Sequence, residues 1–367
     1  MPLARTVVKT YYQNQSESGC IEKVKVLREI FFEEDTMFQP DLCTLCGACL
    51  AECQWMDISS SDAKRLRKQM IEGKYTPVLD NCITCYACNE ICPNQANPSD
   101  QNLELQEKYR SLVPEETVKA IEAQNLFEGE VGEVPQADRV LATCSYGKTK
   151  PELIQGELYD MPQVGGKPFL CWSGFPHLGA PSVQRKHLRT MVDRLALTNA
   201  KEVVCFHVDC YSALVRTAHD SGIDVPFRSV HLAEYLVEFL TNNKDRIKPL
   251  EIDIAYQRPC TSRHTPDAER YIDELFETTG VNRVQRTYDR EKALCCTSVR
   301  LLFGKGNERA DREKNVLDAK EAGARAIVYF CPICGDMLSD VAAEHSLPFI
   351  FLGDLARAAL GEISLPI

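Results

Sequence analysis

Two runs of four cysteines with the same internal spacing constrain this chain more than any other feature of its sequence. Residues 43–53 read CTLCGACLAEC, and residues 82–93 read CITCYACNEICP. Both runs contain the pattern C-x2-C-x2-C-x3-C. Such a run wraps its first three thiolates around one centre by a tight turn, and the fourth leaves on the next helical turn. Cysteines that merely fill a hydrophobic core would be spaced irregularly.

This spacing is typical of proteins with two cubane [4Fe–4S] clusters, in which the fourth cysteine of each run ligates the other cluster. The rule predicts a first cubane held by Cys43, Cys46, Cys49 and Cys92. It predicts a second cubane held by Cys53, Cys82, Cys85 and Cys88. We expect the small residues Gly47 and Ala87 to ease the bends of the two loops. Zinc also binds C-x2-C pairs, but two consecutive runs with matched spacing are difficult to explain as zinc sites.

The 18 cysteines in 367 residues also raise the alternative of a disulfide scaffold. Such scaffolds are small secreted domains, whereas this chain has the length of two or three domains. Its first residues, MPLARTVVKTYYQNQ, lack the apolar segment of a secretory signal. No stretch approaches the roughly 18 consecutive apolar residues that span a membrane. We therefore expect a cytoplasmic protein with no direct membrane span, and its net charge of −11 argues against nucleic-acid binding.

The region around the two runs has the pattern of a mainly helical domain. Residues 59–75, SSSDAKRLRKQMIEGKY, predict a helix with Ser or Asp as its N-cap and Gly73 at its end. Residues 97–129 predict further helices that are broken at Pro114. We expect this domain to cover residues 1–130, with Cys20 as a free thiol.

From about residue 138 the pattern changes to short β-rich apolar runs that alternate with helical patterns. The runs are DRVLATC, KEVVCFHVDC, LEIDIAYQRPC, ARAIVYFCPIC and LPFIFLGDL. This alternation predicts αβ units around parallel sheets. Several runs end in a cysteine, at the carboxyl ends of strands, where such sheets bind ligands.

The cysteines of this second half follow a repeat. Cys260 is followed after 34 residues by the pair Cys295 and Cys296, and after 34 more by Cys331-Pro-Ile-Cys334. An earlier stretch matches it: Leu170-Cys171-Trp172 aligns with Leu294-Cys295-Cys296, His207 with Cys331, and Cys210 with Cys334. Cys144 takes the place of Cys260. The chain is predicted to contain a duplicated module, in residues 131–245 and 246–367.

The pattern C-x(about 35)-CC-x(about 35)-C-x2-C resembles the CCG domain of the heterodisulfide reductase catalytic subunit, and a two-cubane region ahead of two such modules resembles the fused form of that subunit. The iron–sulfur subunit of glycolate oxidase is similar. The resemblance implies a noncubane [4Fe–4S] cluster on Cys260, Cys295, Cys296, Cys331 and Cys334, although an ordinary cubane on four of them stays open. Two adjacent thiolates suit a multi-iron cluster. This chain has Thr297 where the motif has a glycine. We expect the threonine to crowd the approach of a substrate or partner to the cluster.

The first module is degenerate, because Trp172 replaces one of the paired cysteines and cannot bind iron. Its remaining set is Cys144, Cys171, His207 and Cys210. Zinc, a further [4Fe–4S] cluster and no metal all stay open for these residues. We expect Cys205 to lie in the core, and His264, four residues after Cys260, is a candidate proton donor.

These features predict an α+β multidomain protein: a helical ferredoxin-like domain followed by two α/β CCG modules. The favoured function is that of an electron-transfer subunit in an anaerobic oxidoreductase complex, which connects a flavin-containing partner with the noncubane cluster. We expect the flavin on a partner, with further iron–sulfur subunits beside it, because no dinucleotide-binding G-x-G-x-x-G follows a strand in this chain. The alternative is a catalytic disulfide or thiol reductase of the heterodisulfide reductase type. The lost cysteine and Thr297 favour electron transfer.

Overall fold

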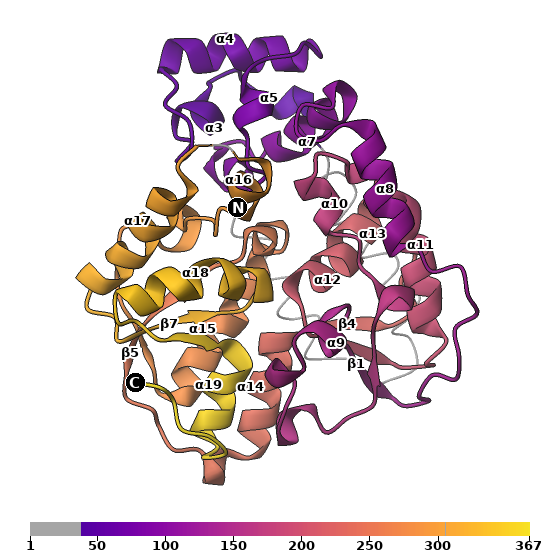
Figure 1. The fold of residues 1–367 in the computed structure, drawn as a ribbon, viewed down its shortest axis with the longest axis vertical. Coiled ribbons are helices and arrows are strands. Elements are labelled where there is room, and N and C mark those ends of the chain that lie inside the picture. The colour runs from indigo at the N-terminus through magenta and orange to yellow at the C-terminus, as the bar shows by residue number, and fades with distance from the viewer. Residues whose placement is uncertain (1–37, 305) are drawn as a thin grey trace, which may run out of the picture. The chain divides into compact units, whose positions relative to one another are not determined.

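A helical region and two parallel sheets follow one another along the chain in the computed structural model, which describes residues 38–304 and 306–367 (Figure 1). Cys20, expected as a free thiol, lies outside the described residues. The observed mixture of helices with two parallel sheets agrees with the predicted α+β class.

The helical region is built from short and medium helices around the two cysteine runs. They are α3 (Ala48–Ala51), α4 (Ser60–Ile71), α5 (Val78–Asn81), α6 (Ala87–Ile91), α7 (Pro98–Tyr109) and α8 (Glu115–Asn125). Helix α4 begins after Ser59, whose hydroxyl accepts from the Asp62 amide at 3.2 Å, and Gly73 follows its end with φ +71°. Pro114 is the N-cap of α8. The helix boundaries predicted from Ser59, Gly73 and Pro114 are confirmed.

The first sheet has four parallel strands in the order β2-β1-β3-β4. Its strands are β1 (Arg139–Ala142), β2 (Gln163–Val164), β3 (Glu202–Cys205) and β4 (Arg228–His231). Its helices are α9 (Tyr146–Thr149), α10 (Gly174–His177), α11 (Pro181–Ala196), α12 (Val208–Ser212), α13 (Ala218–Asp220) and α14 (Leu232–Asn242). A π-helix, Ala213–Thr217, joins α12 to α13.

The second sheet has the corresponding order β6-β5-β7-β8, and its strands are also parallel. Its strands are β5 (Asp253–Gln257), β6 (Asn282–Arg283), β7 (Ala326–Tyr329) and β8 (Phe349–Phe351). Its helices are α15 (Glu269–Thr279), α16 (Ser298–Phe303), α17 (Glu308–Glu321), α18 (Pro332–Glu344) and α19 (Leu352–Ala359). The five apolar runs that predicted strands correspond to β1, β3, β5, β7 and β8.

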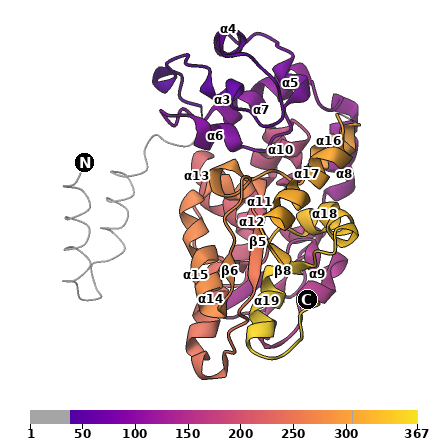
Figure 2. The ribbon, with the colours of Figure 1, turned by 90° about the vertical axis from the view of Figure 1, so that its left-hand side faces the viewer.

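The two sheets share one hydrophobic core. Leu141 and Val204 of the first sheet belong to the same buried cluster as Ile254 and Val328 of the second. Helices α14, α15 and α19 pack against one another in this region (Figures 1 and 2). The opposite faces of the sheets have cores of their own, so each sheet is covered on both sides, as parallel sheets require.

Helix α8 connects the helical region with the first sheet's helices. Val118 of α8 lies in one buried cluster with Trp172, Phe175 and Val183. Among the described helices, none combines the length and the apolar character that crossing a bilayer requires.

Candidate functional site

Left-handed turns bring the first three cysteines of each run together. In the first loop Leu45 (φ 57°) and Gly47 (φ 77°) flank Cys46. In the second loop Thr84 (φ 53°) and Tyr86 (φ 60°) occupy the same positions around Cys85. The second bend is therefore made at Tyr86. Ala87, which we expected to ease it, already begins helix α6.

The structure places Cys92 of the second run beside the cysteines of the first. Burial raises the pKa of the Cys49 thiol to about 11, against the opposing charge of Arg67. The sulfurs of Cys92, Cys43 and Cys46 add to this rise, so they lie close to Cys49. Cys46 is exposed to solvent, and this group of four therefore lies at the surface.

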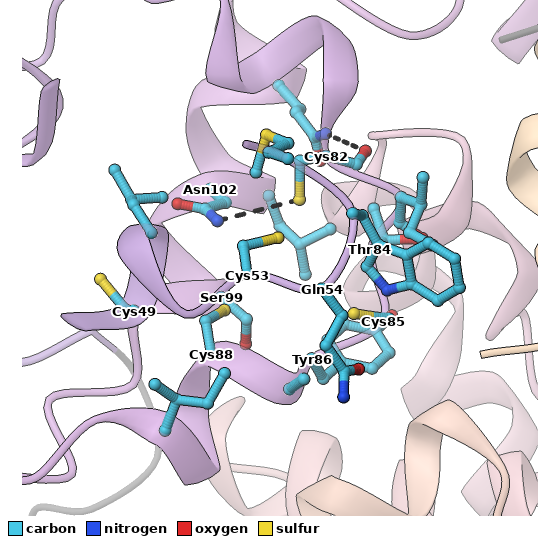
Figure 3. Close-up of a pocket in the computed structure, with 18 residues that line it drawn as sticks. Cys49, Cys53, Gln54, Cys82, Thr84, Cys85, Tyr86, Cys88, Ser99 and Asn102 are labelled. Carbon is cyan, nitrogen blue, oxygen red and sulfur yellow. Dashed lines mark hydrogen bonds between the residues drawn. The ribbon is translucent and has the colours of Figure 1, made fainter. Parts of the chain in front are cut away.

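The second group combines Cys53 of the first run with Cys82, Cys85 and Cys88, and it lines a small cavity (Figure 3). Burial raises the pKa of Cys82 to about 12, and the nearby sulfurs of Cys85 and Cys53 add to the rise. Asn102 directs its Nδ2 toward the Cys82 sulfur at 3.8 Å. Cys49 also lines this cavity, and its charge acts on Cys88, so the crosswise division of the eight cysteines into two sites stays a prediction.

The five cysteines of the second sheet's loops also converge. Cys331 is the N-cap of α18, two residues after β7, and Cys334 lies in the first turn of that helix. Donation from Cys295 lowers the pKa of Cys260 to about 6 in spite of burial. Hydrogen bonds from Cys295 and Cys334 lower the pKa of Cys296. Of the adjacent cysteines, Cys295 therefore interacts with Cys260, and Cys296 interacts with Cys334.

Thr297 is left-handed, with φ 63°, which explains why a glycine is the residue of the CCG motif at this position. Its side chain is fully buried and is not among the described residues that line the neighbouring cavity. The expectation that Thr297 crowds the approach to the cluster stays a prediction; what the structure shows is a left-handed, buried residue directly after the paired cysteines.

Three of the four residues expected in the first module form a compact group. The sulfurs of Cys144, Cys171 and Cys210 all lie within 4.8 Å of one another, and all three residues are buried. His207 is not within 4.8 Å of all three sulfurs, but it lies close enough to Cys171 to lower the pKa of that thiol. Its Nε2 is 3.4 Å from the sulfur of Cys331 in the second unit. Its Nδ1 is buried without a hydrogen-bond partner.

Cys205 is fully buried in the hydrophobic core of the first unit. It lies apart from the group formed by Cys144, Cys171 and Cys210. The expectation that Cys205 belongs to the core is confirmed.

One cavity of about 390 Å³ joins the two cysteine groups, and we call it the shared cavity. Cys144 and Cys171 line it from the first unit, and Cys260, Cys296, Cys331 and Cys334 from the second. The other polar residues that line it are His177, His207, Asp209, Tyr146, Asn125, Ser145, Ser173 and Ser298. The carboxyl ends of both sheets thus open into the same space, which the cysteine spacing alone could not predict.

His177 lies against Cys260. Its Nε2 is 3.7 Å from the Cys260 sulfur. Its Nδ1 is 2.6 Å from the hydroxyl oxygen of Thr84, which lies in the loop of the second cysteine run. No spacing pattern marked His177 as functional, because its place depends on α10 packing against the other unit.

His264, the candidate proton donor, is not among the described residues that line the shared cavity. Its ring packs against Tyr86 with centroids 4.2 Å apart, and its Nδ1 faces Arg216. Burial and the Arg216 charge hold the pKa of His264 well below its usual value. Among the described histidines, His177 and His207 are the ones that face the cavity.

The loop of the second cysteine run, residues 82–88, adjoins the cysteine set of the second unit. Burial raises the pKa of Cys85; Arg263 opposes this rise, and Cys260 adds to it. Arg263 and Arg258 both form ion pairs with Glu90 of α6, at 3.1 Å and 2.7 Å. This buried network fixes the helical region onto the loop that carries Cys260.

The donor chemistry fits iron–sulfur clusters and zinc. All 17 cysteines of the described part are free, so no disulfide competes for the converging sulfurs. Thiolates are the soft ligands that both kinds of centre select.

Comparisons with known proteins agree with this arrangement. Residues 36–93 match the 4Fe-4S dicluster domain, and residues 254–339 match the cysteine-rich CCG domain. The chain is thus an iron–sulfur protein of the oxidoreductase type, with a dicluster region ahead of a CCG domain. More particularly, it is similar to a component of heterodisulfide reductase. The D-type subunit of the dihydromethanophenazine:CoB–CoM heterodisulfide reductase of Methanosarcina mazei is 24% identical over 83% of this chain and 89% of its own length.

Two further similarities are more limited. The probable oxidoreductase YjgC of Bacillus subtilis is 28% identical over 86 residues, which cover 22% of this chain and 9% of that protein. The crystal structure of a hypothetical protein from Helicobacter pylori has a TM-score of 0.57 at 11% identity. It covers 82% of this chain and 66% of its own, and shows likeness of fold alone.

Proposed function

We propose that this chain is the iron–sulfur subunit of an anaerobic oxidoreductase complex and that it reduces a disulfide or related sulfur compound in the shared cavity. The observation that carries this proposal is that both cysteine groups open into one cavity. The sequence alone favoured a purely electron-transferring role, because the first module has lost a cysteine. A concave site at which both cysteine groups meet favours the catalytic alternative, because a cluster held there would face a space that a sulfur compound can enter.

The two cubanes are assigned to the two crosswise groups of cysteines. The first is assigned to Cys43, Cys46, Cys49 and Cys92, and the second to Cys53, Cys82, Cys85 and Cys88. Clusters held there supply one-electron transfer. The exposure of Cys46 supports docking of an electron-donating partner at the first site. The proximity of Cys260 to Cys85 supports a position for the second between the first site and the cluster assigned to Cys260.

The set of the second unit is assigned to a noncubane [4Fe–4S] cluster on Cys260, Cys295, Cys296, Cys331 and Cys334. The contacts of Cys295 with both Cys260 and Cys296 support one centre for all five residues. The five sulfurs exceed the four that a cubane takes, which favours the noncubane form.

Zinc is the centre that we assign to the first unit. Cys144, Cys171 and Cys210 provide three thiolates, which is one fewer than a closed tetrahedral site requires. The unpartnered Nδ1 of His207 supports this histidine as the fourth ligand, and its Nε2 then still contacts Cys331.

We further propose that the two sheet units, residues 131–245 and 246–367, arose by duplication behind a helical domain of residues 1–130. Their identical strand orders support this. Backbone conformation shifts the sequence alignment by one residue, because the left-handed Trp172 corresponds to the left-handed Thr297. Cys171 then corresponds to Cys296, and Leu170 takes the place of Cys295.

The chain's own residues prepare the cavity for a sulfur substrate. Thr84 fixes the ring of His177 against Cys260, and Asp209 lies 3.5 Å from Nε2 of His207. Both rings thus face sulfur atoms from fixed positions. Tyr146 packs edge-on against His207, with centroids 4.8 Å apart, and excludes water from one side.

The expected partner is a flavin-containing subunit, with further iron–sulfur subunits beside it. That the homologue is, by its name, one subunit of a reductase supports assembly into a complex. We propose a cytoplasmic location, and the lack of a bilayer-crossing helix in the described part is compatible with it.

Transfer of electrons to a different active site is the second candidate function. It is favoured by the first unit, whose group of three cysteines cannot build a second five-thiolate cluster. In this case the shared cavity would bind no substrate.

A substitution that fills the shared cavity distinguishes between the two candidate functions. Gly174 lines the cavity, and a Cβ built on it meets nothing within 4 Å, so Gly174→Leu adds bulk without a clash at Cβ. Gly132→Leu is the matched control, because Gly132 is also open and is not among the described lining residues. Each variant is tested as the anaerobic holoprotein with reduced viologen as the electron donor. Thiol release from a disulfide measures the proposed reaction. Iron content and the transfer of electrons from viologen to an artificial acceptor measure whether the clusters are intact.

The catalytic proposal expects Gly174→Leu to lower thiol release by about tenfold or more, since a misplaced substrate loses reactivity, while iron content and acceptor reduction persist. Equal thiol release by the two variants would reject the cavity as the reaction site. Metal analysis adds a second test: the ligand counts predict about twelve irons and one zinc per chain. About eight irons would contradict the assignment of a cluster to the paired cysteines.

A further inference from the structure

A buried arginine in the helical region lacks a counter-charge among the residues that the structure describes. Arg67 is 1% exposed and lies on the inner face of α4, where Ala63 and Met70, one turn to either side, belong to a buried apolar cluster. Its Nη1 donates to Oδ1 of Asn102 at 3.1 Å, and its Cζ lies 4.8 Å from the ring centroid of Phe38. Its Nε and Nη2 have no hydrogen-bond partner in the described part. No hydrogen-bonded carboxylate therefore neutralises this cation there, and burying such a charge is costly.

Arg67 lies between residues of the two cysteine runs. Cys49 of the first run packs in the same buried cluster as the inner face of α4. The second run is reached through Asn102, which accepts from Arg67 and directs its Nδ2 toward the Cys82 sulfur at 3.8 Å (Figure 3). Burial raises the pKa of Cys49 and of Cys88, and in both cases the charge of Arg67 opposes the rise. The unpaired cation thus acts on thiols of both runs.

The charge of Arg67 suits the groups that these thiols are proposed to hold. Four thiolates give a cubane cluster a net negative charge, and each electron that the cluster accepts increases this charge. A fixed cation beside the cluster favours the reduced state, because net charge and hydrogen bonds to the sulfurs set the reduction potentials of iron–sulfur centres. An apolar side chain could fill the same place on α4 without the cost of a buried charge. Packing alone therefore does not account for an arginine at this position.

We infer that Arg67 is the shared counter-charge of the two clusters in the helical region and raises the reduction potentials of both, so that both hold an electron at the same time. The inference rests on the proposed function for the clusters and for the reaction. That reaction, R–S–S–R′ + 2 e⁻ + 2 H⁺ → RSH + R′SH, takes two electrons from the reduced flavin-containing partner and two protons from solvent. Each cluster carries one electron, and the charge of the first electron opposes entry of the second. A cation between the clusters reduces this repulsion.

Substitutions at position 67 separate charge from shape. Arg67→Gln removes the charge and keeps a polar side chain, whereas Arg67→Lys keeps the charge. Arg65→Gln is the matched control, because Arg65 lies on the same helix but is 58% exposed and pairs with Asp62 at 2.7 Å. The midpoint potentials of the two clusters are measured on the anaerobic holoprotein by redox titration followed by electron paramagnetic resonance. Iron is counted in each variant.

We expect Arg67→Gln to weaken reduction of the cluster that includes Cys49 about tenfold, which corresponds to a fall of about 59 mV for a one-electron couple. The other cluster should shift in the same direction by less, because Arg67 reaches Cys82 through Asn102. Arg67→Lys and Arg65→Gln should keep both potentials. Unchanged potentials in Arg67→Gln, or an equal shift in Arg67→Lys or in Arg65→Gln, would overturn the inference.

The iron content covers the case in which a variant loses its clusters. Partial loss leaves the test readable, because a midpoint potential does not depend on how many molecules carry the cluster. Complete loss from Arg67→Gln with full iron in Arg67→Lys would support the counter-charge, whereas complete loss from both would overturn it.

The titration needs no disulfide, so it is independent of the proposed reaction. The expected shift in a protein that reduces no disulfide would retain the counter-charge and reject the catalytic function. Unchanged potentials in a protein that does reduce disulfides would reject the counter-charge alone.

Discussion

Nε2 of His207 lies 3.4 Å from the sulfur of Cys331, across the boundary between the two sheet units. Both residues are N-caps of helices that follow a central strand, His207 before α12 and Cys331 before α18. Equivalent positions of the two units thus face each other directly. A change of charge at one cysteine group therefore alters the electrostatic potential at the other, because the imidazole ring of His207 lies between them.

The metal site assigned to the first unit can be tested at Cys210. Because Cys210 is one of three buried thiols within 4.8 Å, we expect Cys210→Ser to lose about one zinc per chain and to keep its iron. Cys205→Ser is the matched control, since Cys205 is also fully buried but belongs to the core. Zinc and iron are counted on anaerobically purified protein. Loss of zinc from both variants, or from neither, would contradict the assignment.

Thr297 stores backbone strain. It adopts φ 63° as a non-glycine residue, and its hydroxyl is buried without a partner. Thr297→Gly removes both costs, and we expect the free energy of unfolding to rise by about 1 kcal/mol. Thr279→Gly is the control: its hydroxyl donates to the Leu275 carbonyl at 2.8 Å inside α15, so stability should fall by about 1 kcal/mol. A loss of stability in Thr297→Gly as well would refute this account.

Glu90 holds two buried arginines. Its carboxylate pairs with Arg258 and Arg263, whose side chains are 4% and 3% exposed. Glu90→Gln leaves two buried cations short of negative charge, and we expect a loss of about 3 kcal/mol in unfolding free energy. Thermal unfolding of the anaerobic holoprotein measures the effect. Glu115→Gln, which breaks the exposed pair with Lys119, should leave the midpoint unchanged. A similarly small shift for Glu90→Gln would show that the network contributes little.

We expect the free energy of unfolding to fall at mildly acidic pH because His231 is buried in its neutral form. Burial lowers its pKa from 6.5 to about 3, while its Nδ1 accepts from the Ala233 amide at 3.3 Å. A histidine with a depressed folded pKa stabilises the protein fully above its unfolded pKa of about 6.5, and this contribution is lost as the pH falls. Between pH 7.5 and 5 the loss amounts to about 2 kcal/mol.

His231→Asn keeps a capping acceptor but does not titrate, so its unfolding free energy should vary less over this pH range. His219→Asn, at an exposed histidine, should retain the dependence of the unmodified protein. Parallel pH curves for all three proteins would rule out His231 as the source.

Local patterns in the sequence were sufficient for much of the fold. Helix α4 begins after Ser59, and α8 begins after Pro114, because capping and proline chemistry act over a few residues. Cys92 lies near Cys49, and the division of the eight cysteines into two sites stays a prediction. What each group binds stays a prediction, since thiol positions fit more than one kind of centre.

The features that the sequence did not reveal depend on how the two sheets pack. His177 faces Cys260 because α10 of one unit meets a loop of the other. Tyr86, where we expected Ala87, makes the left-handed turn, since backbone conformation there is imposed by the converging cysteines. By residue counting Trp172 aligns with Cys296, whereas by its left-handed backbone it matches Thr297. The two alignments differ by one residue because the segments that follow, up to His207 and Cys331, would then differ by one residue in length.

The common core beneath both sheets affects how the chain is made. Leu141 and Val204 of the earlier sheet are buried with Ile254 and Val328 of the later one. During synthesis the first sheet leaves the ribosome before the second sheet, which covers one of its apolar faces, has been made. That half-built intermediate exposes parallel strands, which pair slowly and aggregate readily. We therefore expect fragments cut between the two sheets to be poorly soluble, because each would expose the apolar face that the other sheet covers.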